Sequence, residues 1–200
     1  MGFLKTNDKT NIMKIKNIFS ITVVVVAAVM AFNTSAVAQV KYLPGYVIML
    51  NGDSLKGEIK TNAKHEFDNF TKASFRKKEG SEIKTFSPAK IKEYCVDGIT
   101  FVSRNIDGEQ VFVKRLSKGA VNLYEAQVEV LQMNEIKVKS DYYMEKAGGE
   151  FVKVKSSKFK KQMTDAMSDN QEIVKALEDK KYDYENIVEV VDAYNKQSSN

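Results

Sequence analysis

The amino-acid sequence predicts an α+β protein: an antiparallel, strongly twisted sheet or a partly closed β-barrel, followed by three short C-terminal helices. Three observations lead to this prediction. Apolar residues recur with period two from Tyr46 to Val154, as in strands with one buried face. After Ser156 the apolar period becomes about 3.6, which is typical of amphipathic helices. Strands that all precede the helices favour an α+β fold over repeated βαβ units.

The strands are expected in a β domain at residues 39–156. Tyr46 to Leu50 is apolar at every position, which indicates a central strand. Asp97-Gly98 is the strongest two-residue hairpin turn of the chain. In the last hairpin, Val152 and Val154 are expected to face inward, with Lys153 and Lys155 facing outward. The expected strands are residues 46–50, 55–59, 73–75, 83–86, 94–96, 99–102, 110–116, 121–131, 136–139, 142–145 and 151–155.

The segments outside these strands carry turn and helix signals. Residues 61–69 are polar and irregular. Ser87 is expected to cap a single helical turn over residues 89–92, with Pro88 as its first residue, where a missing N–H costs nothing. Residues 157–200 are expected to form the three helices and to pack on the β domain, because helices this short are not stable alone in water.

Each predicted helix has an apolar stripe and two of them have a capping signal. The expected caps are a capping box of Asp169 with Glu172, and Asp183 as the N-cap of the last helix. The stripes are Phe159, Met163 and Met167; Ile173, Val174 and Leu177; and Tyr184, Ile187, Val188, Val191 and Tyr194.

The N-terminal segment has the features of a secretory signal peptide. Lys14 and Lys16 precede an apolar run over residues 18–32, and Ala36-Val37-Ala38 is an A-x-A cleavage site. We therefore expect cleavage after Ala38, and the run is shorter than the roughly 20 residues of a membrane span. Met13 offers an alternative start that would make residues 1–12 a gene-calling artefact. Because Gln39 rather than a cysteine follows the site, we expect an exported, soluble protein that is not a lipoprotein, in the periplasm or outside the cell.

Composition limits the classes of partner. The removed segment holds Lys5, Lys9, Lys14 and Lys16 against Asp8, so the net charge of +5 falls to +2 in the mature chain. This balance gives no argument for nucleic-acid binding. Cys95 is the only cysteine, which excludes an intramolecular disulfide and is typical of a small buried apolar residue.

The sequence predicts no catalytic residue, no metal site and no cofactor. His65 is the only histidine and lies in the most polar loop. One histidine and one cysteine are too few for a structural zinc site, and neither calcium-loop nor phosphate-binding glycine motifs are present. Paired carboxylates acting on a glycan remain open as an alternative, with Glu93 and Asp97 as candidates that also suit solvated turns.

One cluster of residues is a candidate partner surface. Lysines gather at the junction between the last strand and the first helix, and two tyrosines lie just upstream. Such a surface could bind an acidic polysaccharide or a lipid headgroup, although lysines on an edge strand are also an ordinary solubility device. Its members are Tyr142, Tyr143, Lys153, Lys155, Lys158, Lys160 and Lys161.

Several stretches resemble small exported proteins of the Bacteroidetes. Residues 45–59 are similar to their opening GYI-x-L-NGD-T-hydrophobic-KG-x-I, residues 86–92 and 119–124 to their YSP-x-x-I and G-x-V-x-LY stretches, and residues 181–195 to their closing Y-x-Y-x-x-I…YN. These stretches consist of turn and core residues, so the resemblance implies a fold and a compartment and no reaction.

The function predicted from the sequence is a non-enzymatic module that binds a partner or an envelope component. Two alternatives are a carboxylate-based hydrolase acting on glycans and a structural subunit of an envelope assembly. A cleft with two facing carboxylates would favour the hydrolase. An exposed apolar patch of more than a few hundred Å² would favour the subunit.

Overall fold

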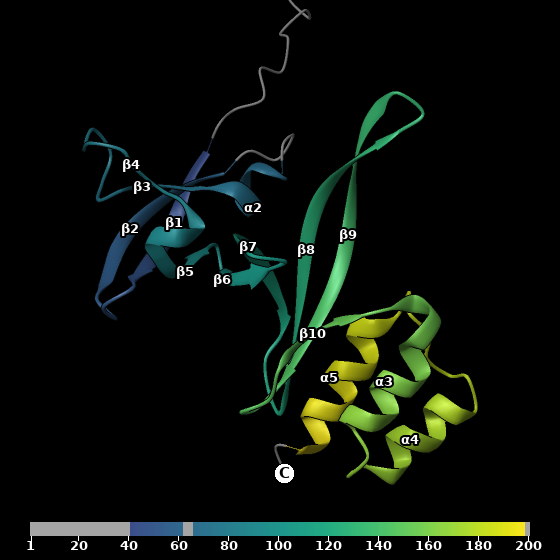
Figure 1. Cartoon of the computed structure of the whole chain (residues 1–200). Coiled ribbons are helices and arrows are strands. Elements are labelled where there is room, and N and C mark those ends of the chain that lie inside the picture. The colour runs from purple at the N-terminus through teal and green to yellow at the C-terminus, as the bar shows by residue number, and fades with distance from the viewer. Residues whose placement is uncertain (1–40, 62–65, 199–200) are drawn as a thin grey trace, which may run out of the picture. The chain divides into compact units, whose positions relative to one another are not determined.

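A computed structural model describes residues 41–61 and 66–198 (Figure 1). The predicted signal peptide with its cleavage site after Ala38, and the loop residue His65, lie outside the described residues. No helix in the described ranges is both long enough and apolar enough to cross a membrane.

The described strands form one ten-stranded antiparallel sheet in the order β10-β9-β8-β7-β6-β5-β1-β2-β3-β4. The α+β class is confirmed. The sheet is open, however, because its end strands β4 and β10 do not pair, so closure into a barrel is not found. The strands are β1 (Lys41–Met49), β2 (Ser54–Thr61), β3 (Ala73–Arg76), β4 (Lys84–Phe86), β5 (Ile91–Val96), β6 (Ile99–Ile106), β7 (Glu109–Ser117), β8 (Val121–Gln132), β9 (Glu135–Lys146) and β10 (Phe151–Val154).

Except for β5 with β1, the antiparallel neighbours are successive along the chain, and short turns join most of them. Asp97 and Gly98 both have positive φ, 51° and 80°, as the two-residue turn between β5 and β6 requires. Strand β1 lies between β2 and β5, so it is central in the sheet as predicted, although only Val47 of its apolar run is fully buried and Leu50 lies beyond the strand. Residues 136–139 and 142–145, expected as two strands, are parts of the single strand β9.

One face of the first seven strands carries an aromatic core. The ring of Tyr94 stacks on that of Phe101, with centroids 4.9 Å apart, and meets Phe112 edge-on. The short helix α2 (Asp68–Thr71) adds Phe70 to this core, and the Tyr94 hydroxyl donates to the carbonyl of Asn69. The sequence reading of residues 61–69 as irregular missed this helix, because a single apolar residue gives no periodicity.

The C-terminal helices α3 (Phe159–Ala166), α4 (Gln171–Glu178) and α5 (Ile187–Ser198) bury a second core against β8, β9 and β10. Their expected stripes supply Phe159, Met163, Met167, Ile173, Leu177, Ile187, Val191 and Tyr194, and the sheet supplies Val121, Leu123, Met144 and Val154. Figure 1 shows the three helices gathered at the β10 end of the β8–β9 pair.

A buried asparagine joins the last helix to the sheet. The Asn195 side chain accepts a hydrogen bond from the N–H of Val121 at 2.9 Å and donates to the carbonyl of Val121 and to the Ser117 hydroxyl. The turn between β7 and β8 approaches this side chain closely. A Cβ on Gly119 would lie 2.5 Å from Cγ of Asn195, so only glycine fits there.

The expected cap of α4 differs in the structure. The N-cap of α4 is Asn170, whose side chain accepts from the N–H of Ile173. Asp169 accepts instead from the Tyr194 hydroxyl, and this bond lowers the pKa of Asp169. Because that carboxylate is already engaged by α5, the box of Asp169 with Glu172 was a wrong prediction.

The remaining local differences concern Ser87, Asp183 and Val152. Ser87 precedes the 3₁₀ turn η1 (Pro88–Lys90) without a side-chain hydrogen bond to it. Asp183 and Asn186 bond reciprocally, each accepting from the other's backbone N–H, in the turn before α5 begins. Val152 is 36% exposed, because β10 is an edge strand that the helices cover at Val154 and not at Val152.

We predict that Asn195→Ala lowers the free energy of unfolding by about 2–4 kcal/mol, because it leaves the N–H and carbonyl of Val121 buried without partners. Urea denaturation would measure the loss. Lys196→Ala, at an exposed position of the same helix, is the control and should change the stability by less than about 0.5 kcal/mol. Equal losses in the two variants would contradict the role of Asn195.

Candidate binding site: the β8–β9 arm and the C-terminal groove

The structure divides the seven residues of the predicted partner surface between different faces. Side chains alternate along β9, so Tyr142 and Tyr143 point to opposite sides of the sheet. Tyr142 packs against Tyr184 on the helix side, with ring centroids 5.4 Å apart. Tyr143 stacks on Phe151 on the other side.

Lys153 lies beside Tyr143 but is occupied by an internal partner. Its Nζ is 2.5 Å from Oδ2 of Asp141, and this hydrogen bond raises the pKa of Lys153. Burial raises the pKa of Tyr143, so its phenol stays protonated at neutral pH. Lys155 is exposed and takes part in neither the Tyr142–Tyr184 nor the Tyr143–Phe151 ring contact.

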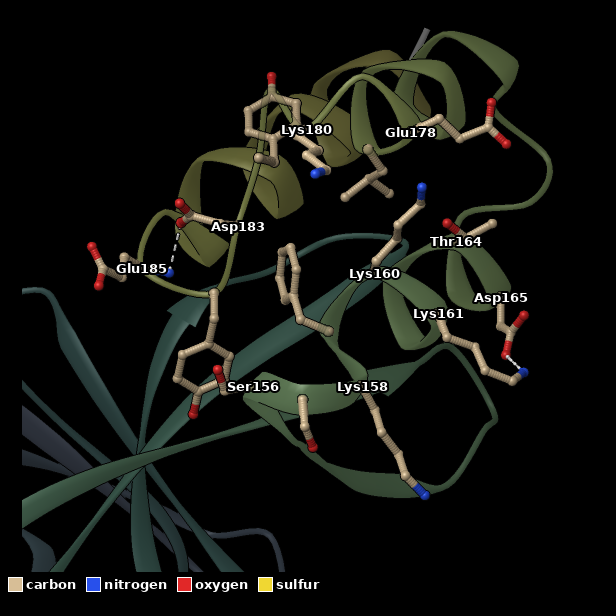
Figure 2. Close-up of a pocket in the computed structure, with 15 residues that line it drawn as sticks. Ser156, Lys158, Lys160, Lys161, Thr164, Asp165, Glu178, Lys180, Asp183 and Glu185 are labelled. Atoms are coloured by element: carbon tan, nitrogen blue, oxygen red, sulfur yellow. Dashed lines mark hydrogen bonds and ion pairs between the residues drawn. The ribbon is translucent and has the colours of Figure 1, made fainter.

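The other three lysines line a groove of about 850 Å³ between α3 and the segment that joins α4 to α5 (Figure 2). Lys158, Lys160 and Lys161 come from one side, and Lys180 adds a fourth cation. Figure 2 shows Lys158 extending away from Lys160. Lys161 is paired with Asp165 at 2.6 Å.

Carboxylates balance the charge of this groove. Four acidic side chains line it with the four lysines: Asp165, Glu178, Asp183 and Glu185. A groove of balanced charge has no net attraction for an acidic polysaccharide or an anionic headgroup. Its arrangement therefore gives little support to an anionic ligand.

Two carboxylates of the sheet, Glu93 and Glu145, are each bound to an arginine. Glu93 accepts from Arg115 at 2.9 Å and from the hydroxyl of Tyr46, while Asp97 lies in the β5–β6 turn. Burial raises the pKa of Tyr124. The Tyr124 hydroxyl donates a hydrogen bond to Glu145, and Glu145 also accepts one from Arg104 at 2.9 Å. Within the described ranges, no three His, Cys, Asp or Glu side chains come together as a metal site would require.

The most unusual feature is the distal part of the β8–β9 hairpin, residues 127–140, here called the arm. Pairing of β8 with β7 reaches only Lys114 opposite Glu125, and pairing of β9 with β10 reaches only Val154 opposite Tyr142. Beyond these points, among the strands that the structure describes, β8 and β9 pair only with each other, up to a two-residue turn at Met133 and Asn134. Figure 1 shows this ribbon extending past the neighbouring strands.

The arm exposes large apolar side chains. Leu131 is 75%, Met133 90%, Ile136 71% and Val138 49% exposed. Leu131 lies opposite Ile136 in the ladder, and Val138 follows two residues after Ile136, so these three share one face. Glu135, Lys137 and Lys139 lie on the other face. The arm thus combines exposed apolar side chains, with Glu129 opposite Val138 on the same face, and two strand edges that no strand in the described ranges covers.

Sequence reasoning found both strands of the arm but not their exposure. The apolar residues alternate with period two in both strands, at Val128 and Val130 and at Ile136 and Val138. This alternation predicts a strand, but it does not show whether the apolar face is buried or exposed to solvent. The turn lacks glycine, although Met133 and Asn134 both have positive φ, at 51° and 65°.

No family model, curated protein or solved structure matches this chain. The resemblance to exported Bacteroidetes proteins stays a prediction.

We predict that the free energy of unfolding of the double variant Leu131→Ser, Ile136→Ser differs from that of the wild type by less than about 0.5 kcal/mol, because both side chains are exposed. Leu123→Ala, on the buried part of the same strand, should cost about 2–5 kcal/mol. Chemical denaturation would measure both. A large loss in the arm variant would show that its apolar residues serve the fold rather than binding.

Proposed function

We propose that this protein is an exported, non-enzymatic binding module that pairs a polypeptide strand with the free edge of its arm. The observation that carries the proposal is the combination of bare apolar side chains and unpaired strand edges on residues 127–140. Strand addition to a free edge satisfies backbone N–H and carbonyl groups and gives apolar side chains cross-strand partners.

The free edges favour a protein over a lipid bilayer as the binding partner. A two-stranded ribbon inserted into hydrocarbon would leave the N–H and carbonyl groups of both outer edges without hydrogen bonds, at several kcal/mol for each group. A partner strand removes this cost on the edge it covers. Glu129 and Glu135 balance Lys137 and Lys139 in the arm, so its charge gives no attraction to an anionic membrane surface.

The arm favours an assembly subunit over a hydrolase. An exposed apolar patch is the feature expected of a subunit, and four large side chains provide one. The catalytic alternative needs two facing carboxylates, whereas Glu93 and Glu145 are each bound to an arginine. The signal peptide at residues 1–38 supports a location in the periplasm or outside the cell, without a lipid anchor.

Photo-crosslinking in the exporting cells tests this function. A photoreactive amino acid at position 136 should form an adduct with a protein, because a paired strand brings the partner within reach of that side chain. The adduct should decrease when Leu131→Ser is added. The same amino acid at Ile99, an exposed apolar residue of another hairpin, is the matched control and should form no such adduct.

Adducts with lipid alone, or no adduct from position 136, would overturn the proposal. Turnover of a glycoside, ester or peptide by the purified protein would contradict its non-enzymatic part.

A further inference from the structure

We infer that the strand bound by the arm is β9 of a second copy of this chain, in an antiparallel pair with a two-fold axis at Lys137. This inference rests on the proposed function and names its partner. In such a symmetric contact, each residue meets the same partner on both copies. Centring on Lys137 sets Ile136 opposite Val138 and Glu135 opposite Lys139, twice each.

The backbone of β9 has the alternation that this pairing needs. Gln132 and Glu135 close the two-residue turn and pair with each other, so their N–H and carbonyl groups point into the hairpin. Because these directions alternate along a strand, the backbone N–H and carbonyl groups of Lys137 and Lys139 point into the hairpin. The backbone groups of Ile136 and Val138 point outward. Opposite one another in two copies, Ile136 and Val138 exchange four hydrogen bonds.

The side chains match across the same axis. Ile136 and Val138 place apolar groups against apolar groups on one face. On the other face Glu135 meets Lys139 of the second copy. Within one copy the Lys139 side chain is 65% exposed and pairs with Asp141 at 3.5 Å, so it would share its charge between Asp141 and Glu135 of the second copy. The other oxygen of Asp141 is bound by Lys153.

Other pairings of the arm match less well. Centring on Ile136 sets Glu135 against Lys137, but it brings the turn residues Met133 and Asn134 opposite Lys139 and Val138, so only three strand residues per copy can pair. Centring on Val138 would set Glu135 against Asp141 and Lys137 against Lys139, which places like charges opposite each other. The free edge of β8 has Glu129 as its single charged side chain in residues 127–132, so two copies of it meet without complementary charge. The pairing centred on Lys137 has one unfavourable feature, the two facing Lys137 side chains.

Charge reversal tests the pairing on the purified full chain. Sedimentation should show a monomer and dimer in concentration-dependent equilibrium, because five paired residues per copy make a small contact. Glu135→Lys and Lys139→Glu should each weaken the dimer by about tenfold, and the double variant should restore it. Lys137→Thr should strengthen it, because the facing like charges are removed.

A cysteine on the axis tests the register. Directly opposite Cβ atoms in such a pair lie about 4.5–5.5 Å apart, within reach of a disulfide. In a Cys95→Ser background, Lys137→Cys should give a disulfide-linked dimer under mild oxidation. Lys139→Cys is the matched control and should form no disulfide-linked dimer, because position 139 faces Glu135.

A wild-type chain that stays monomeric at millimolar concentration would overturn the inference, as would charge reversals without rescue in the double variant, or equal crosslinking of both cysteine variants. The proposed function would survive these results if position 136 still crosslinks to a different protein in cells. It would fail with them if position 136 forms no protein adduct.

Discussion

The hydrogen bonds of the buried Asn195 side chain join the two parts of this fold. They hold helix α5 to both backbone groups of Val121, the first residue of β8, and to Ser117 at the end of β7. With Gly119 leaving room for the asparagine, the three helices cover Leu123 and Met144 on the proximal parts of β8 and β9. Both strands are thereby fixed at one end, and the arm is the continuation of strands already anchored.

This anchoring explains how an exposed ribbon can be stable. A two-stranded hairpin is marginal alone in water, but β8 and β9 pair over twelve positions and the proximal ones lie on a core. The arm therefore has an ordered ladder without a core of its own. The free edge of β9 carries Lys137 and Lys139, a common protection against uncontrolled strand pairing, while the exposed Ile136 and Val138 beside them favour a partner. The facing lysines at position 137 limit the strength of self-pairing, as befits a reversible contact.

The sequence predicted local structure well wherever periodicity and turn residues carry the information. The hairpin at Asp97-Gly98 and the stripe of Phe159, Met163 and Met167 lie where expected. Properties that depend on tertiary neighbours were not predictable. Val138 is exposed because the neighbouring strand β10 pairs with β9 only as far as Tyr142. Tyr142 and Tyr143 are adjacent in sequence, yet they face opposite sides of the sheet. The capping role went to Asn170 because Tyr194, distant in the chain, binds Asp169.

Hydrogen exchange of the Ile136 and Val138 amides at several protein concentrations tests the central claim most directly. Both N–H groups point outward from the arm in one copy and are hydrogen-bonded in the pair. The account predicts exchange that slows as the concentration rises, for these two amides and not for Lys137 and Lys139, whose N–H groups bond within the hairpin. Exchange of Ile136 and Val138 that is fast and independent of concentration would contradict it.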